Sequence, residues 1–299
     1  MNEFLAFSFT PLLIGCLSAV ACALPGNFLV LRRQALIGDA ISHVVLPGIV
    51  IAFLITGTIS TWPMLLGSAG AALLAVAMIE GIQRFGQIEP GAAMGVTFTT
   101  LFAAGVLLLE QSDTSAVHLD VEHALFGNLE SLIWLDATDW SSLSDPAALA
   151  GLPPELFRIA FVALAMIIGL VVFWRPLAIS TFDEGFAGTL GLPIRAIALG
   201  LVIASAIAAV AAFDAVGSII VIAMFICPPA AARLMTNRLG IQVLWSVVFA
   251  LTSAIAGYFL AGYGPLWFGG QNAVSAAGMI ATVSGFILLI SAFAVPARR

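Results

Sequence analysis

The chain contains no lysine, so all ten of its basic residues are arginine. A Walker A loop needs a Gly-Lys pair to reach the phosphates of a nucleotide, and the sequence therefore excludes a standard P-loop. Any ATP hydrolysis that serves this protein must come from another polypeptide. We accordingly expect that the chain is not itself an enzyme.

Charged residues and thiols are also scarce. Charged side chains make up 9% of the 299 residues and hydrophobic ones 62%, and the mean hydropathy is +1.14, which excludes an ordinary soluble domain. Cys16, Cys22 and Cys227 form no CxxC pair and have no histidine at zinc-finger spacing, which argues against a structural zinc site. We expect residues 1–299 to form one polytopic, all-α membrane domain.

Nine apolar runs are long enough to cross a bilayer, which takes about 20 residues. They cover 10–31, 35–57, 62–83, 91–109, 156–175, 195–213, 216–236, 241–261 and 272–295. The break at Asp214 between the sixth and seventh runs is short, so eight spans are the alternative. With nine spans and the N-terminus outside, every arginine except Arg158 falls on the cytoplasmic side, as the positive-inside rule requires.

The connection 110–155 lies outside in this topology. It holds His118, His123 and more than half of the sixteen acidic residues, but no arginine. In the segment 119–135, acids alternate with Leu, Phe and Trp at helical spacing, which predicts an amphipathic helix at the membrane interface. Two roles stay open for the connection: a solubilising acidic loop, or a surface that gathers cations or docks a delivering partner.

A short segment on the cytoplasmic side, 182–193, has the signals of a capped helix. Asp183 and Glu184 begin it, and Gly191 and Pro193 follow its end, as expected from the helix dipole and from C-terminal capping. A docking element for a soluble motor protein and a plain connecting turn both fit this pattern.

Asp39 and His43 are the most informative polar residues, because they lie inside the otherwise uncharged run 35–57. An aspartate at membrane depth costs roughly 2.5–3.5 kcal/mol, which some interaction must offset. The i, i+4 spacing places the carboxylate and the imidazole on one helical face, one turn apart. Together they offer donors to a divalent metal ion or a path for protons.

The surroundings of the pair favour a transport pathway. At 1.5 Å per residue, His43 lies on the order of 15 Å from Arg33, near the midplane of the bilayer core. Ser42 adds a hydroxyl group beside the pair. Pro47 has no N–H, so the carbonyl of His43 loses its helical partner. A satisfied polar cluster that joins helices is the other interpretation.

The types of ligand limit the metal ion that the pair would suit. A carboxylate and an imidazole without a thiolate suit Mn(II), Fe(II) or Zn(II) and argue against Cu(I). Two ligands are too few for tight binding, but a symmetric dimer would double them to four.

Asp214 could line the same transport pathway as Asp39 and His43, or it could cap a broken helix, and capping ranks first. Small residues such as Gly91 and Gly95 would allow helices to pack closely.

Four segments in this order resemble the bacterial permease family that imports manganese, zinc or iron within ABC transporters, across about residues 12–293. They read LRRQALIGDAISHVVLPG, LDVEHALFGNL, FDEGFAGTLGLP and FDAVGSIIVIAMFICPPAAARLMTNRLG. The second and fourth look more like the manganese branch. The chain departs from the family at Pro228 and Pro229, where a single proline is more common.

The resemblance implies a type II-like ABC importer permease, which forms a homodimer with cytoplasmic ATP-binding subunits and an extracytoplasmic metal-binding protein. It also implies that Asp39 and His43 coordinate the metal ion and that 182–193 is the coupling helix. We expect a multi-pass protein of the bacterial cytoplasmic (inner) membrane, surrounded by lipid, with no nucleic-acid partner and no permanently bound cofactor. Its cargo would be manganese first, then zinc or iron, passing a transient site at the dimer interface.

The alternative is a self-contained secondary transporter that exchanges metal for protons and uses Asp39 and His43 as a proton relay. Such a protein would show related features in its two halves, and the chain has no second GDxxSH segment. A metalloenzyme is disfavoured because the sequence lacks HExxH.

Overall fold

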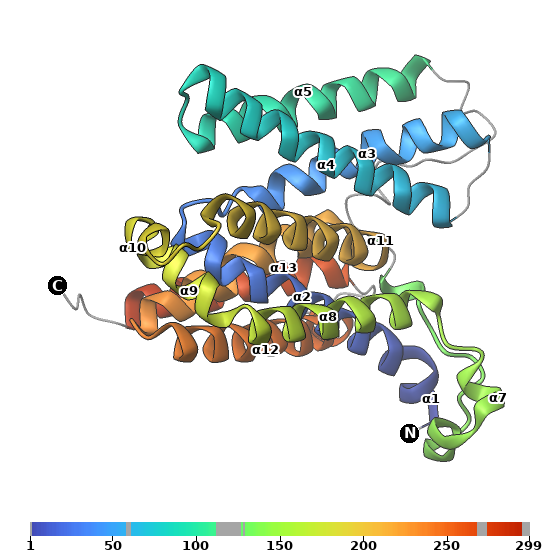
Figure 1. Ribbon diagram of the computed structural model, residues 1–299. Coiled ribbons are helices and arrows are strands. Elements are labelled where there is room, and N and C mark those ends of the chain that lie inside the picture. Colours follow the sequence, from blue (N-terminus) through green and yellow to red (C-terminus); the bar gives the residue numbers. More distant parts are fainter. Residues whose placement is uncertain (1, 58–60, 112–126, 128, 268–273, 295–299) are drawn as a thin grey trace.

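The computed structural model describes residues 2–57, 61–111, 127, 129–267 and 274–294 (Figure 1). Within these residues all regular elements are helices. They are α1 (Asn2–Phe4), η1 (Leu5–Phe9), α2 (Thr10–Leu31), α3 (Ile37–Thr56), α4 (Thr61–Gly86), α5 (Pro90–Gln111), η2 (Leu129–Ser131), η3 (Trp140–Ser144), α7 (Pro146–Leu149), α8 (Pro154–Val172), α9 (Trp174–Phe182), α10 (Glu184–Thr189), α11 (Ile194–Met235), α12 (Leu239–Trp267) and α13 (Ala276–Ala294).

The described part of the chain holds nine helical stretches that are long and apolar enough to cross a membrane. They agree with the nine predicted runs, so within the described residues the helices favour nine spans over eight. Two of the nine, Ile194–Phe213 and Ala215–Met235, lie within the single element α11.

Gly217 allows α11 to contribute two spans. A straight helix of its 42 residues would be about 63 Å long, roughly twice the thickness of the bilayer core. Gly217 interrupts it with φ 78° and ψ 172°, a conformation open essentially to glycine alone. The two apolar spans part at Asp214, as the sequence predicts, but the backbone remains helical there and departs from helical geometry three residues later, at Gly217.

The helices form two layers in Figure 1. The upper layer consists of α3, α4 and α5, and the larger body contains α2, α8, α12 and α13. Helix α11 packs against members of both. The side chains of Phe28 from α2 and of Ile220, Met224 and Phe225 from the second half of α11 are fully buried, so these two helices form the centre of the core.

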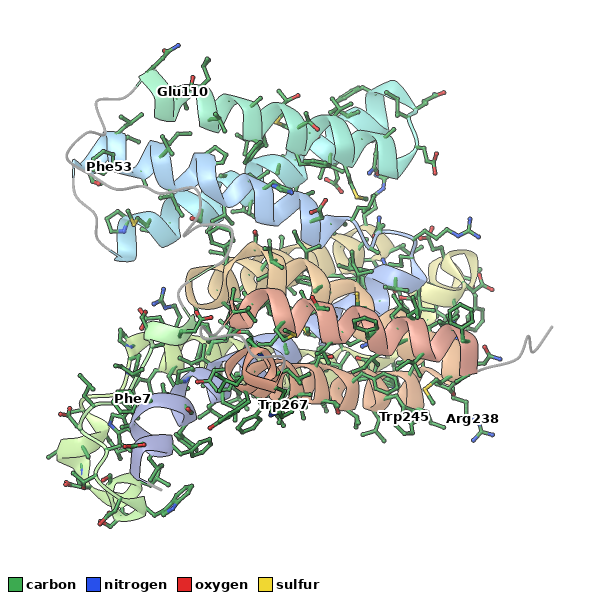
Figure 2. All side chains as sticks on the ribbon, turned by 180° about the vertical axis from the view of Figure 1, so that it is seen from behind. Phe7, Phe53, Glu110, Arg238, Trp245 and Trp267 are labelled. Carbon is green, nitrogen blue, oxygen red and sulfur yellow. The ribbon has the colours of Figure 1, made fainter. Side chains whose placement is uncertain are left out.

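The structure places Arg238 and Glu110 at opposite ends of the molecule (Figure 2). Helix α10 and the last described residues lie at one end, and the N-terminus and α7 lie at the other (Figure 1). Arg238 lies at the end with α10, whereas Glu110 lies at the opposite end (Figure 2). This arrangement agrees with the topology predicted from the arginines, in which the α10 end faces the cytoplasm.

Part of the acidic connection packs against the N-terminal helices. Trp134 is fully buried with Leu5 and Ala148, its backbone N donates to Ala6 O at 2.8 Å, and its Nε1 donates to Ala148 O at 2.7 Å. Over 129–135 the only helical element is therefore the short η2 (Leu129–Ser131), and the predicted interfacial helix is absent there, because Trp134 is buried by protein. The rest of that prediction, with His118 and His123, falls outside the described residues, except for Gly127.

Candidate functional site

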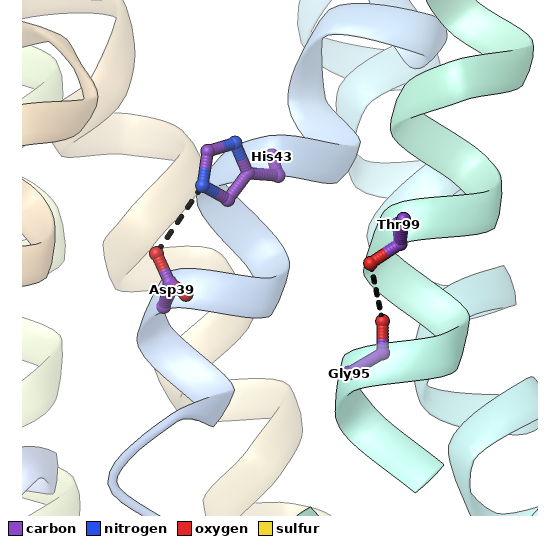
Figure 3. A network of polar contacts seen from close by, with 4 residues as sticks. All are labelled: Asp39, His43, Gly95 and Thr99. Carbon is purple, nitrogen blue, oxygen red and sulfur yellow. Dashed lines mark hydrogen bonds and ion pairs between the residues drawn. The ribbon is translucent and has the colours of Figure 1, made fainter. Parts of the chain in front are cut away.

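Asp39 and His43 contact each other on α3. His43 Nε2 lies 3.3 Å from Asp39 Oδ1, and the two side chains are 28% and 23% exposed (Figure 3). Asp39 is in the first turn of α3, where the helix dipole stabilises a carboxylate. The i, i+4 spacing thus places an oxygen and a nitrogen donor side by side, with one side of the pair still open.

Two aromatic rings from α5 hold the imidazole of His43. The ring of Phe98 stacks on it at a centroid distance of 5.5 Å and an angle of 22°. Phe102, one turn further along α5, meets it edge-on at 5.4 Å and 75°. These contacts restrict the orientation of the imidazole. Sequence reasoning missed both residues, because the spacing of two phenylalanines in the predicted span 91–109 does not say which helix they face.

Helix α3 also approaches its two neighbours closely. The backbones of Gly48 in α3 and Gly67 in α4 touch, so that a Cβ atom on either glycine would overlap with the backbone of the other. A Cβ atom on Gly105 of α5 would lie 2.7 Å from Cβ of Pro47. The helix that carries Asp39 and His43 is therefore fixed on two sides.

The pair is incomplete as a metal site within one chain. Among the residues that the structure describes, no group of three or more His, Cys, Asp or Glu side chains could hold a metal ion. Ser42 lies on α3 and Asp214 on α11, but their side chains are outside the described part, and their roles stay predictions.

The predicted capped helix is present as α10. Asp183 is its N-cap and accepts a hydrogen bond from Phe186 N at 2.8 Å, with Glu184 in the first turn. Gly191 follows the helix end with φ 73°, and Pro193 is the N-cap residue of α11. These residues therefore have the structural places that the sequence indicated, whereas the coupling role of 182–193 stays a prediction.

Arg32 connects the last turn of α9, which directly precedes α10, with the start of α3. It lies at the corner between α2 and α3, where its Nη2 donates to Ser180 Oγ at 2.8 Å and its Nε donates to Thr181 Oγ1 at 3.1 Å. Burial lowers the pKa of the Arg32 guanidinium, and the carboxylate of Glu184 partly offsets this. Sequence reasoning treated Arg32 only as a topology signal, because its partners lie almost 150 residues away.

Comparisons with known proteins show similarity over nearly the whole chain. The ABC 3 transport family matches residues 5–139 and 148–295. The manganese transport system membrane protein MntD of Bacillus subtilis is 37% identical over 279 residues, which are 93% of this chain and 88% of that protein. The zinc transport system membrane protein TroD of Treponema pallidum is 36% identical over 83% of this chain and 65% of its own length.

A solved structure has a similar fold. PsaBC from Streptococcus pneumoniae, in complex with Fab, superposes with a TM-score of 0.76 at 27% sequence identity. The match covers 99% of this chain and 95% of the other. The described helices thus share the fold of that protein.

Proposed function

Because the chain belongs to the ABC 3 transport family, we propose that it is the permease subunit of an ATP-driven importer of divalent metal ions. It is a multi-pass protein of the bacterial inner membrane, with nine apolar helices in its described part. Relatives named as manganese and zinc transport proteins favour these two ions, with manganese first. The observation that carries the proposal is the contact of Asp39 with His43 inside a membrane span.

The pair would bind the ion transiently. A carboxylate oxygen and an imidazole nitrogen suit Mn(II), Zn(II) and Fe(II), and the two donor atoms already face each other at 3.3 Å. Phe98 and Phe102 limit the orientations of His43, so little side-chain freedom is lost when an ion binds. A small number of ligands favours release, which an importer requires as much as binding.

A second copy of the chain would complete the site. Asp39 and His43 supply two ligands, and the described residues contain no further cluster. The pair stays partly exposed, which leaves room for donors from outside the chain. In a homodimer that brings two α3 helices together, the ligands would double to four, and an extracytoplasmic metal-binding protein would deliver the ion from the opposite end to α10.

Cytoplasmic ATP-binding subunits would supply the energy, since this chain lacks the lysine of a P-loop. We propose that they bind α10, and that Arg32 transmits the movement to α3. Ser180 and Thr181 directly precede Phe182 and Asp183, at the start of α10, and Arg32 precedes Ile37, at the start of α3. A shift of α10 would therefore pull on the helix that carries Asp39 and His43.

Arg32→Gln should uncouple ATP hydrolysis from transport. Glutamine keeps part of the length but cannot donate to both hydroxyl groups as the guanidinium does. We expect the assembled complex to hydrolyse ATP while metal uptake falls by roughly tenfold, the equivalent of about 1.4 kcal/mol. The matched control is Arg33→Gln, which removes the same charge from an exposed neighbour. Equal uptake in the two variants would contradict a coupling role for Arg32.

Reconstitution tests the proposed function itself. Proteoliposomes that contain the permease, its ATP-binding subunits and the metal-binding protein should accumulate Mn(II) only when ATP is present. The permease alone should not move the ion under a proton gradient. Uptake by the permease alone would instead support the secondary transporter. Competition by Zn(II) and Fe(II) in the complete system would identify the preferred cargo.

A further inference from the structure

A buried polar cluster joins α2 to α12 near the α10 end of the molecule. Asn27, Gln242 and Ser246 are fully buried, and the helices that carry them are membrane spans. Asn27 Nδ2 donates to Ser246 Oγ at 2.7 Å and to the backbone oxygen of Ala23 at 2.8 Å. Gln242 Nε2 donates to Asn27 Oδ1 at 3.2 Å. Arg238, four residues before Gln242, marks this end of the molecule in Figure 2.

The bonds of this cluster determine which atom of Gln242 is left over. The carbonyl of Ala23 can only accept a hydrogen bond, so it faces the amide nitrogen of Asn27 and leaves Asn27 Oδ1 for the other side. Asn27 Oδ1 can in turn only accept, so it faces the amide nitrogen of Gln242. Gln242 Oε1 therefore points away from Asn27, and this buried oxygen has no hydrogen-bond partner in the described part of the chain.

Arg233 supplies a second buried atom, Nη1, that has no partner among the described residues. Arg233 is in the last turn of α11 and Gln242 lies near the start of α12, and the link between these two spans is three residues long. The two side chains therefore lie at nearly the same depth in neighbouring antiparallel helices. Gln242 faces α2 through the polar cluster. Arg233 faces α2 as well, because Pro229, one turn earlier on α11, lies with Cγ 3.1 Å from the position of a Cβ atom on Gly26.

We propose that a single water molecule is bound between Arg233 Nη1 and Gln242 Oε1. The guanidinium can only donate a hydrogen bond and the amide oxygen can only accept one, so their shared ligand must do both. The guanidinium would repel a cation and the amide oxygen would repel an anion, whereas water accepts from one group and donates to the other. Buried waters typically satisfy polar groups of this kind.

This water would complete a continuous chain of hydrogen bonds that connects α11, α12 and α2. None of the residues in the chain lies on α3, which carries Asp39 and His43. The site is therefore separate from the metal pathway and does not rest on the proposed function.

A density map of the full chain in detergent, at a resolution that shows ordered water, tests this site directly. It should contain one peak that lies about 2.7–3.2 Å from both Arg233 Nη1 and Gln242 Oε1. A direct hydrogen bond between the two side chains would overturn the proposal, as would well-resolved side chains with no peak between them. A peak that changes when the salt in the buffer is exchanged would show an ion and would also overturn it.

The thermal stability of three variants tests whether the two side chains share one ligand. Arg233→Met and Gln242→Met each remove one side of the bridge and leave the other side buried and unpaired. Each should lower the unfolding temperature of the solubilised chain by roughly 2–4 °C or more. The double variant should lose clearly less than the sum of the two single losses, because the same bridge is absent in all three. The bond from Gln242 to Asn27 is lost with and without Arg233, so it cancels from the comparison.

Arg238→Met provides the matched control. Arg238 is an exposed arginine beside the same link between α11 and α12, so its loss should change the unfolding temperature little and should simply add to that of Gln242→Met. Additive losses for Arg233→Met and Gln242→Met would mean that the two side chains act independently, and would overturn the proposal.

Discussion

Asp39→Ala and His43→Ala should each abolish metal uptake, while membrane insertion and assembly with the partner subunits stay intact. Each substitution removes one of the two donors that the chain offers on this face of α3. Loss of a residue that merely supports a metal ligand typically costs 10–100-fold in affinity or activity. Loss of a ligand itself should therefore reduce uptake by about 100-fold or more.

The fold should tolerate both changes. Asp39 and His43 are partly exposed, and the contact between them lies within one helix, so only the ring contacts of His43 with Phe98 and Phe102 of α5 are lost in His43→Ala. In Asp39→Ala the imidazole still stacks on Phe98 and Phe102. Size-exclusion chromatography and co-purification of the ATP-binding subunits would confirm that an uptake defect comes from the site.

Thr99→Val tests whether the loss of any polar group near Asp39 and His43 is enough to reduce uptake. Thr99 lies on α5, across from the pair, and its hydroxyl donates to Gly95 O of its own helix at 2.7 Å (Figure 3). Valine removes the hydroxyl group at nearly constant shape, and uptake of radioactive Mn(II) should remain near the wild-type rate. Wild-type uptake in both Asp39→Ala and His43→Ala would contradict the proposed site.

The parts of the site that depend on local periodicity were predictable from the sequence. Asp39 and His43 meet because residues four apart share a helical face. Asp183 caps α10 for an equally local reason, since its side chain reaches the backbone N–H of Phe186. Both features depend only on a few consecutive residues and on helix geometry.

Features that depend on the choice of neighbour were not predictable. Phe98 and Phe102 contact His43 only because α5 packs on α3, and nothing local specifies that pairing. Gly91 and Gly95 were expected to allow close packing, yet a Cβ atom on either would meet nothing within 4 Å in this chain. A small side chain permits a close approach, but the partner helix decides where the approach occurs.

Gly48→Ala should destabilise the layer formed by α3, α4 and α5. The added Cβ atom would lie 2.5 Å from Gly67 O and 2.8 Å from Cα of Ser68. All of the nearest atoms belong to the backbone of α4, so no flexible side chain can move aside and the helices must separate. Overpacking of this kind typically costs about 1–3 kcal/mol. Thermal unfolding of the solubilised permease, followed by tryptophan fluorescence, would measure the loss.

Gly70→Ala provides the matched control on α4. Gly70 lies three residues after Gly67, and a Cβ atom there would meet nothing within 4 Å. Alanine should therefore be neutral or slightly stabilising, because it has the higher helix propensity. If Gly48→Ala unfolds at the same temperature as Gly70→Ala, the backbones of α3 and α4 do not touch as described. If Gly48→Ala is destabilised and also loses uptake while Asp39 and His43 are unchanged, then transport requires α3 to be held in place by α4.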